Sequence, residues 1–252
     1  MNKYIVSILT NLKLTSRDRM ALFFSYAFPL MFFFIFAQIY GSGIGGGIVQ
    51  VVSSVLIIGV LGNGFFGAGM RAVSERETGI LRRYKVAPTT AAPIVVSSLV
   101  TGLVNYVPSA SLIITLAHFV YGMPWPSRPF SLFIFLAFAV MAFRALGMIV
   151  ASVVNSMQES QIVIQMLYLP MLFLSGATFP MDAMPVWLQS VAQFLPASHL
   201  YNGMQGILIK NETIAANWMA FIATGCEYRG KGEYCASMVE PRGLSFHAVY
   251  RC

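Results

Sequence analysis

Long, uninterrupted runs of apolar residues dominate the chain, and short polar turns separate them. Each run extends for about 20 residues, the length that an α-helix needs to cross a bilayer. Membrane barrels instead show short segments of alternating polarity. The pattern therefore predicts an all-α integral membrane protein, a polytopic helical bundle with five full spans. These spans are expected at residues 20–40, 48–70, 93–121, 130–153 and 161–179.

An amphipathic segment precedes the first run, at residues 1–19. Apolar residues such as Ile5 and Leu12 share one helical stripe, and Ser7 and Asn11 lie on the opposite side. A short basic helix of this kind beside a span is typical of an interfacial helix that lies along the membrane surface.

The region after the fifth run is broken by prolines and is too interrupted for a clean span. Residues 181–208 are expected to form short re-entrant helices at the outer face. The last apolar stretch, residues 214–226, has 13 residues and predicts only a truncated or atypical sixth span. The tail at residues 227–252 has no helical period, and we expect it to be disordered or the product of a shifted reading frame.

Composition and charge agree with a membrane chain. Of the 252 residues, 57% are hydrophobic and 10% charged, whereas a soluble domain carries about 25% charged residues. The net charge is +7, but the basic residues flank apolar runs, which indicates membrane topology rather than nucleic-acid binding. Basic residues before the first run and in the loop at residues 71–92 place both segments, and the N-terminus, on the cytoplasmic side.

The sequence carries no recognisable catalytic motif. It has no phosphate-binding GxxxxGK[ST] loop, no HExxH and no GxSxG elbow. Arg144 is the one clear charge inside a predicted span, which marks it as a candidate for the transport path. Alternatively, it reaches the interface or binds a backbone carbonyl.

The charged loop between the second and third runs has two interpretations. Val73, Leu81 and Tyr84 recur at helical spacing among charges of both signs. This pattern predicts either an interfacial helix that anchors the loop or a helix that docks into a groove of a cytosolic partner.

Two stretches resemble a known family. The sequence VSERETGILRRYKVAPTT, residues 73–90, is similar to the cytoplasmic loop of ABC-2 type transporter permeases of the drug-resistance and nodulation-factor kind. The sequence LYLPMLFLSGATFPMDAMPVWLQSVAQFLPASHL, residues 167–200, resembles the C-terminal signature of the same family. The resemblance covers about residues 1–220, and residues 20–226 would form the transmembrane domain.

The resemblance implies the membrane subunit of an exporter without an ATPase site of its own and without a cofactor. ATP would be bound by a separate ABC ATP-binding subunit, present in two copies, beside a second permease copy or a paralogue. The protein would lie in a bacterial-type inner or plasma membrane and move a hydrophobic, amphipathic, glycan-like or lipid-like substrate outward.

The same resemblance implies two groups of functional residues. The ATPase-coupling group is Glu75, Arg76, Glu77, Gly79, Arg82 and Arg83. The group of the outer re-entrant signature is Ser175, Gly176, Pro180, Asp182 and Pro185. The alternative function is an ion-coupled secondary transporter or channel, for which Arg144 and His118 are the candidate ionisable groups.

Overall fold

All regular structure in the described part of the chain is helical, which confirms the predicted all-α class. The computed structural model describes residues 3–17, 26–40, 47–77, 92–179 and 184–209. The helices are α1 (Lys3–Arg17), α3 (Phe28–Tyr40), α4 (Gly47–Gly64), η2 (Phe65–Met70), α5 (Arg71–Glu77), α7 (Ala92–Tyr121), α8 (Pro129–Val153), α9 (Met157–Leu174), α10 (Val186–Gln193) and α11 (Pro196–Ile209).

Three helices of the described residues are long and apolar enough to cross a membrane. They are Gly47–Glu77, Val95–Tyr121 and Pro129–Val153. The predicted first span is represented by α3, of 13 residues, and the predicted fifth by α9, of 18 residues with a polar first turn. Five full spans therefore remain a prediction, and the sixth span and the tail lie outside the described residues.

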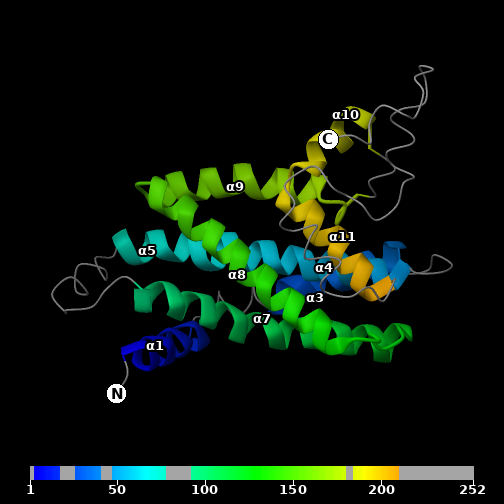
Figure 1. The fold of residues 1–252 in the computed structure, drawn as a ribbon, viewed down its shortest axis with the longest axis horizontal. Coiled ribbons are helices and arrows are strands. Elements are labelled where there is room, and N and C mark those ends of the chain that lie inside the picture. The colour runs from blue at the N-terminus through cyan, green and yellow to red at the C-terminus, as the bar shows by residue number, and fades with distance from the viewer. Residues whose placement is uncertain (1–2, 18–25, 41–46, 78–91, 180–183, 210–252) are drawn as a thin grey trace, which may run out of the picture.

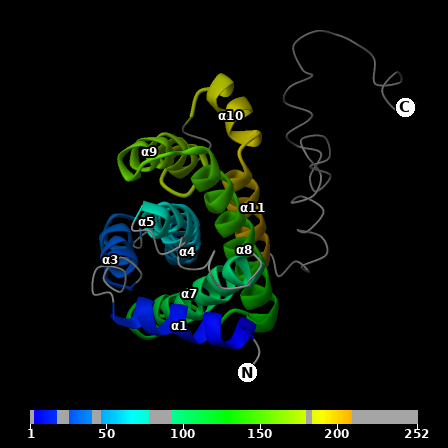
Figure 2. The same ribbon diagram turned by 90° about the vertical axis from the view of Figure 1, so that its left-hand side faces the viewer.

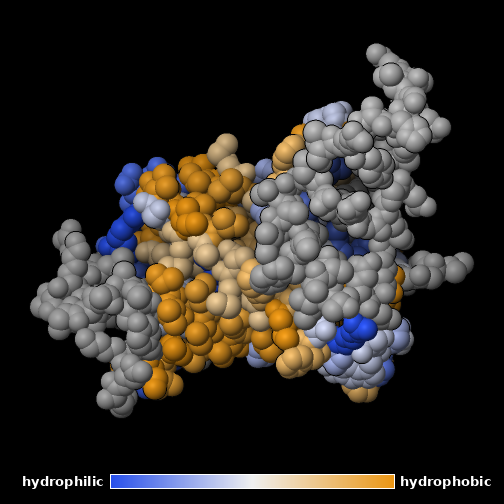
Figure 3. Space-filling view, in the orientation of Figure 1, coloured by the Kyte–Doolittle hydropathy of each residue, from blue (hydrophilic) through white to orange (hydrophobic). Residues whose placement is uncertain are grey.

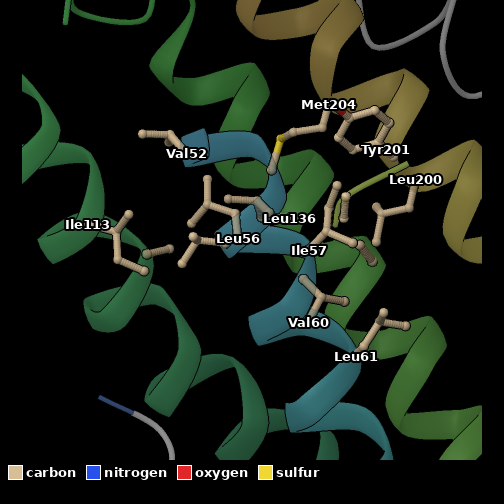
Figure 4. Close-up of a cluster of buried hydrophobic side chains, with 14 of the residues drawn as sticks. Val52, Leu56, Ile57, Val60, Leu61, Ile113, Leu136, Leu200, Tyr201 and Met204 are labelled. Carbon is tan, nitrogen blue, oxygen red and sulfur yellow. The ribbon is translucent and has the colours of Figure 1, made fainter. Parts of the chain in front are cut away.

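The central helix of the bundle is α4, which α3, α7, α8 and α9 surround (Figure 2). Apolar residues lie on all sides of this helix and leave no continuous polar face, so the helix can be buried on all sides. Val52, Leu56 and Leu61 are fully buried. Figure 4 shows this cluster meeting Leu136 of α8 and Met204 of α11.

Glycines bring α4 and η2 against the backbone of α8. A Cβ atom at Gly64 would lie 2.7 Å from the Phe143 carbonyl oxygen, and one at Gly69 would lie 3.0 Å from the Gly147 carbonyl oxygen. Small residues allow helix backbones to approach closely. Such packing drives the association of membrane helices, because lipid is as apolar as their side chains and gives no hydrophobic driving force.

The outer surface is strongly apolar over the middle of the bundle. Figure 3 shows an apolar band with hydrophilic residues toward the two ends. On α9, for example, Met166 is 71% exposed and Ile162 61% exposed. Surface of this kind requires a lipid environment.

Helix α1 presents its apolar side outward and its polar side to the bundle. Ile5 and Leu9 are exposed, whereas the Ser7 hydroxyl and the Asn11 amide donate to the Ser97 hydroxyl of α7, at 3.1 and 2.7 Å. An outward apolar side fits the predicted interfacial helix, and its position in the membrane remains a prediction.

Candidate coupling site and buried arginine cluster

One end of the bundle holds most of the charged side chains of the described residues, and we call it the polar end. It contains α5, α1, the start of α7 and the turn between α8 and α9 (Figure 1). The sequence predicted that the second span stops at residue 70. The helix instead continues through the π-helical turn η2 to Glu77, so the loop at residues 71–92 begins as an extension of the buried central helix.

Arg71 ties this extension to α1. Its Nε atom pairs with the Glu75 carboxylate at 2.9 Å, one helical turn away. Its other nitrogens donate to the Thr15 hydroxyl at 2.5 Å and to the Asn11 side-chain oxygen at 3.2 Å. Three helices, α1, α5 and α7, thus share one polar network, because Asn11 also reaches Ser97.

Arg76 and Glu77 hold the turn between α8 and α9 from its two sides. The Arg76 guanidinium donates to the carbonyl oxygens of Ala151 and Val154, at the C-terminal end of α8. The Glu77 carboxylate accepts from the Met157 amide, at 2.7 Å, in the first turn of α9. A cation at a helix C-terminus and an anion at a helix N-terminus both match the helix dipole and satisfy free backbone groups.

Arg144 lies in a buried polar cluster between α4, α7 and α8. Its side chain is 4% exposed. One guanidinium nitrogen donates to the Asn63 side-chain oxygen at 2.7 Å and to the Asn63 carbonyl at 3.3 Å, and another donates to the Ser98 hydroxyl at 2.9 Å. A Cβ atom at Gly102 would collide with the arginine side chain, so glycine makes the space for it.

Of the outer signature residues, Ser175 and Gly176 lie in the turn after α9, and Pro185 caps the start of α10. Gly176 has a positive φ of 84°, which glycine adopts without strain. The buried Ser175 hydroxyl accepts from the Ala177 amide at 3.3 Å, and the Pro185 carbonyl accepts from the Leu188 and Gln189 amides at the start of α10. These three residues shape two turns. Pro180 and Asp182 lie outside the described residues.

The predicted helices at residues 181–208 are present as α10 and α11, and α11 packs against α4. Of the predicted coupling residues, the structure brings Glu75, Arg76 and Glu77 together on α5, and Gly79, Arg82 and Arg83 lie outside the described residues.

The surroundings of Arg144, namely Asn63, Ser98 and Gly102, were not predicted from the sequence. Asn63 carries a usable signal, because an amide inside an apolar run needs a hydrogen-bond partner. Ser98 and Gly102 look like ordinary small residues of a packed membrane helix, so only the structure identifies them.

A helical bundle with an apolar surface, an apolar core and a small buried polar cluster defines a polytopic integral membrane protein. Within that class, the chain belongs to the ABC-2 type transporter family, whose profile matches residues 3–209. The resemblance seen in the two sequence stretches is thereby confirmed. No solved structure matches the chain.

Several curated bacterial proteins are similar to the chain. The inner membrane transport permease YhhJ of Escherichia coli is 22% identical over 178 residues, 70% of this chain and 46% of its own length. The probable multidrug ABC transporter permease YbhR of the same organism is 22% identical over 67% of this chain and 45% of its own. Nodulation protein J of Rhizobium leguminosarum bv. viciae is 42% identical over 64 residues, 25% of each chain. The chain spans less than half the length of the permeases YhhJ and YbhR.

Proposed function

We propose that this chain is the membrane subunit of an ABC exporter, driven by ATP that two copies of a separate ATP-binding subunit hydrolyse. A second permease copy or a paralogue completes the complex in a bacterial inner membrane. The cargo is hydrophobic, amphipathic, or glycan- or lipid-like. Membership of the family supports the transporter role, and the names of the relatives YhhJ and YbhR support the term permease. The outward direction rests on the family resemblance.

The observation that carries this proposal is the firm attachment of α5 to the bundle. Arg71 joins α5 to α1, while Arg76 and Glu77 join it to the turn between α8 and α9. The helix is also continuous with the buried helix α4 through η2. A partner that pushes on residues 71–92 from the cytosol would therefore move several transmembrane helices together.

This attachment gives the coupling residues different roles. Arg76 and Glu77 each form hydrogen bonds to the turn between α8 and α9, so we assign them as positioning residues that transmit motion. Contact with the ATP-binding subunit is assigned to the rest of the loop, including Gly79, Arg82 and Arg83. ATP binding would then shift the bundle between inward-open and outward-open states, as a ligand shifts any two-state equilibrium.

Arg144 has a different position in the proposed mechanism. It is enclosed among neutral partners, so it does not line an open pathway in this conformation. A role in the transport path requires that the cluster around it opens when the bundle changes state, and this role remains a prediction.

An affinity experiment tests the proposal. The tagged full chain is expressed in a native bacterial host, extracted gently from the membrane and analysed for co-purifying proteins by mass spectrometry. The double variant Arg82→Glu/Arg83→Glu is compared with Arg128→Glu, a control on the exposed loop before α8, at the other end of the bundle.

We expect an ATP-binding subunit to purify with the wild type and with the control, and to be lost from the double variant. Well-folded wild type without any ATP-binding subunit would contradict the exporter proposal and favour the ion-coupled transporter. Undiminished recovery with the double variant would place the docking contact elsewhere on the chain.

A further inference from the structure

A small cavity lies beside Arg144, toward the polar end of the bundle. Its volume is about 30 Å³, enough for a water molecule or one compact ion. It lies between the extended central helix, α7 and α8. The polar side chains that line it are Arg71, Glu75, Ser98, Thr101 and Arg144.

Two residues that line this cavity each carry a buried polar atom without a hydrogen-bond partner among the described residues. The two atoms are the Nε atom of Arg144 and the hydroxyl oxygen of Thr101, whose residues are 4% and 2% exposed. Both groups can donate a hydrogen. An unpaired buried donor costs about 1–3 kcal/mol, and more when it is charged, so a molecule that accepts from both is favoured here.

The charges around the cavity do not balance. Two guanidinium groups and one carboxylate line it, and the carboxylate of Glu75 is already paired with Arg71 at 2.9 Å. Arg144 donates only to neutral oxygens, those of Asn63 and Ser98. A buried cation whose hydrogen bonds all go to neutral oxygens is expensive, because these groups do not fully replace the water that it has lost.

We infer that this cavity is a binding site for a compact monovalent anion of about the size of chloride. The anion accepts from the Arg144 Nε–H and the Thr101 hydroxyl, and it supplies the missing negative charge. The small volume favours a halide over a larger organic anion, including the headgroup of a cargo molecule. The bound anion stabilises the closed arrangement of α4, α7 and α8 around Arg144.

Chloride titration of the purified full chain in lipid nanodiscs tests this inference. Sodium chloride replaces sodium gluconate at constant ionic strength, and thermal unfolding is followed at each concentration. We expect Tm to rise with chloride and then saturate, since a ligand that binds only the folded state stabilises it. Bromide should act like chloride, whereas sulfate should give only a non-saturating rise in Tm, because it stabilises folded proteins through exclusion from their surface.

Three variants connect the response to this cavity. Thr101→Val keeps the side-chain shape and removes one donor, so the chloride affinity should fall by roughly 10- to 100-fold, the loss expected for one hydrogen bond to a charged group. Arg144→Gln should abolish the response. Arg128→Gln, an exposed control on the opposite end of the bundle, should retain it. Chloride-35 NMR line broadening measures binding directly, so the test holds even where Arg144→Gln folds poorly.

A wild-type Tm that is equal in chloride and gluconate would overturn the inference and indicate that water fills the cavity. A full response in both Thr101→Val and Arg144→Gln would overturn it as well, because the anion would then bind elsewhere. No ATP-binding subunit or nucleotide is present in these measurements, so their outcome is independent of the exporter proposal.

Discussion

Replacing Gly147 by alanine tests whether the glycine crossing between α8 and the central helix stabilises the bundle. A Cβ atom at Gly147 would collide with the Gly64 carbonyl oxygen and lie 3.3 Å from the Gly69 amide nitrogen. Both obstacles are backbone atoms of packed helices, which cannot move aside as a flexible side chain can. Overpacking of this kind costs about 1–3 kcal/mol, and we expect the upper part of that range.

Gly62→Ala is the matched control. Gly62 lies in the central helix α4, two residues from the Gly64 carbonyl that Gly147 approaches, and a Cβ atom at Gly62 would meet nothing within 4 Å. Both substitutions gain the higher helix propensity of alanine, about 1 kcal/mol, so the difference between them reports the collision alone. That difference should be about 3 kcal/mol.

Thermal stability in detergent measures this difference. The two variants are heated, and the fraction that remains monodisperse is determined by size-exclusion chromatography. For a chain of this size 1 kcal/mol corresponds to about 2–4 °C, so the two midpoints should differ by roughly 6–12 °C. Equal midpoints would refute the reasoning, because they would show that the helices do not cross closely at Gly147.

Three further substitutions probe other contacts. Asn63→Ala removes the acceptor of the Arg144 guanidinium at 2.7 Å and should cost about 1.5–3 kcal/mol in the same thermal assay, whereas loss of an unimportant contact would leave Tm unchanged. Tyr106→Phe removes a buried hydrogen bond of 2.6 Å to the Leu56 carbonyl and should cost about 1 kcal/mol. Arg76→Ala detaches α5 from the end of α8, so the coupling of ATP hydrolysis to transport should fall roughly 2- to 30-fold while the ATP-binding subunit still co-purifies. Unchanged coupling in reconstituted vesicles would exclude this transmitting role for Arg76.

The helices of the bundle were largely predictable from the sequence. The expected run at residues 130–153 matches α8, which is Pro129–Val153, and the expected run at residues 93–121 matches α7, which is Ala92–Tyr121. Long apolar segments fix these helices, because their backbone groups find no partners in lipid and must bond within the helix.

The boundary between the second span and its charged loop was predicted less well. The charged residues after residue 70 predicted that the span ends there and a loop begins, yet the helix continues to Glu77. The continuation depends on Arg71, Arg76 and Glu77, whose partners lie on α1 and in the turn between α8 and α9. A local sequence pattern cannot identify hydrogen-bond partners that lie 50 to 80 residues away along the chain.

The sequence by itself determined the membrane class, most helix positions and the family, since hydropathy and the two family motifs are local properties of the chain. It also marked Arg144 as unusual. Only the tertiary structure decided what surrounds that arginine, and that α5 is held by the bundle instead of projecting freely. Tertiary packing determines these contacts. A buried charge is stabilised by whichever polar groups the crossing of three helices brings within hydrogen-bonding distance.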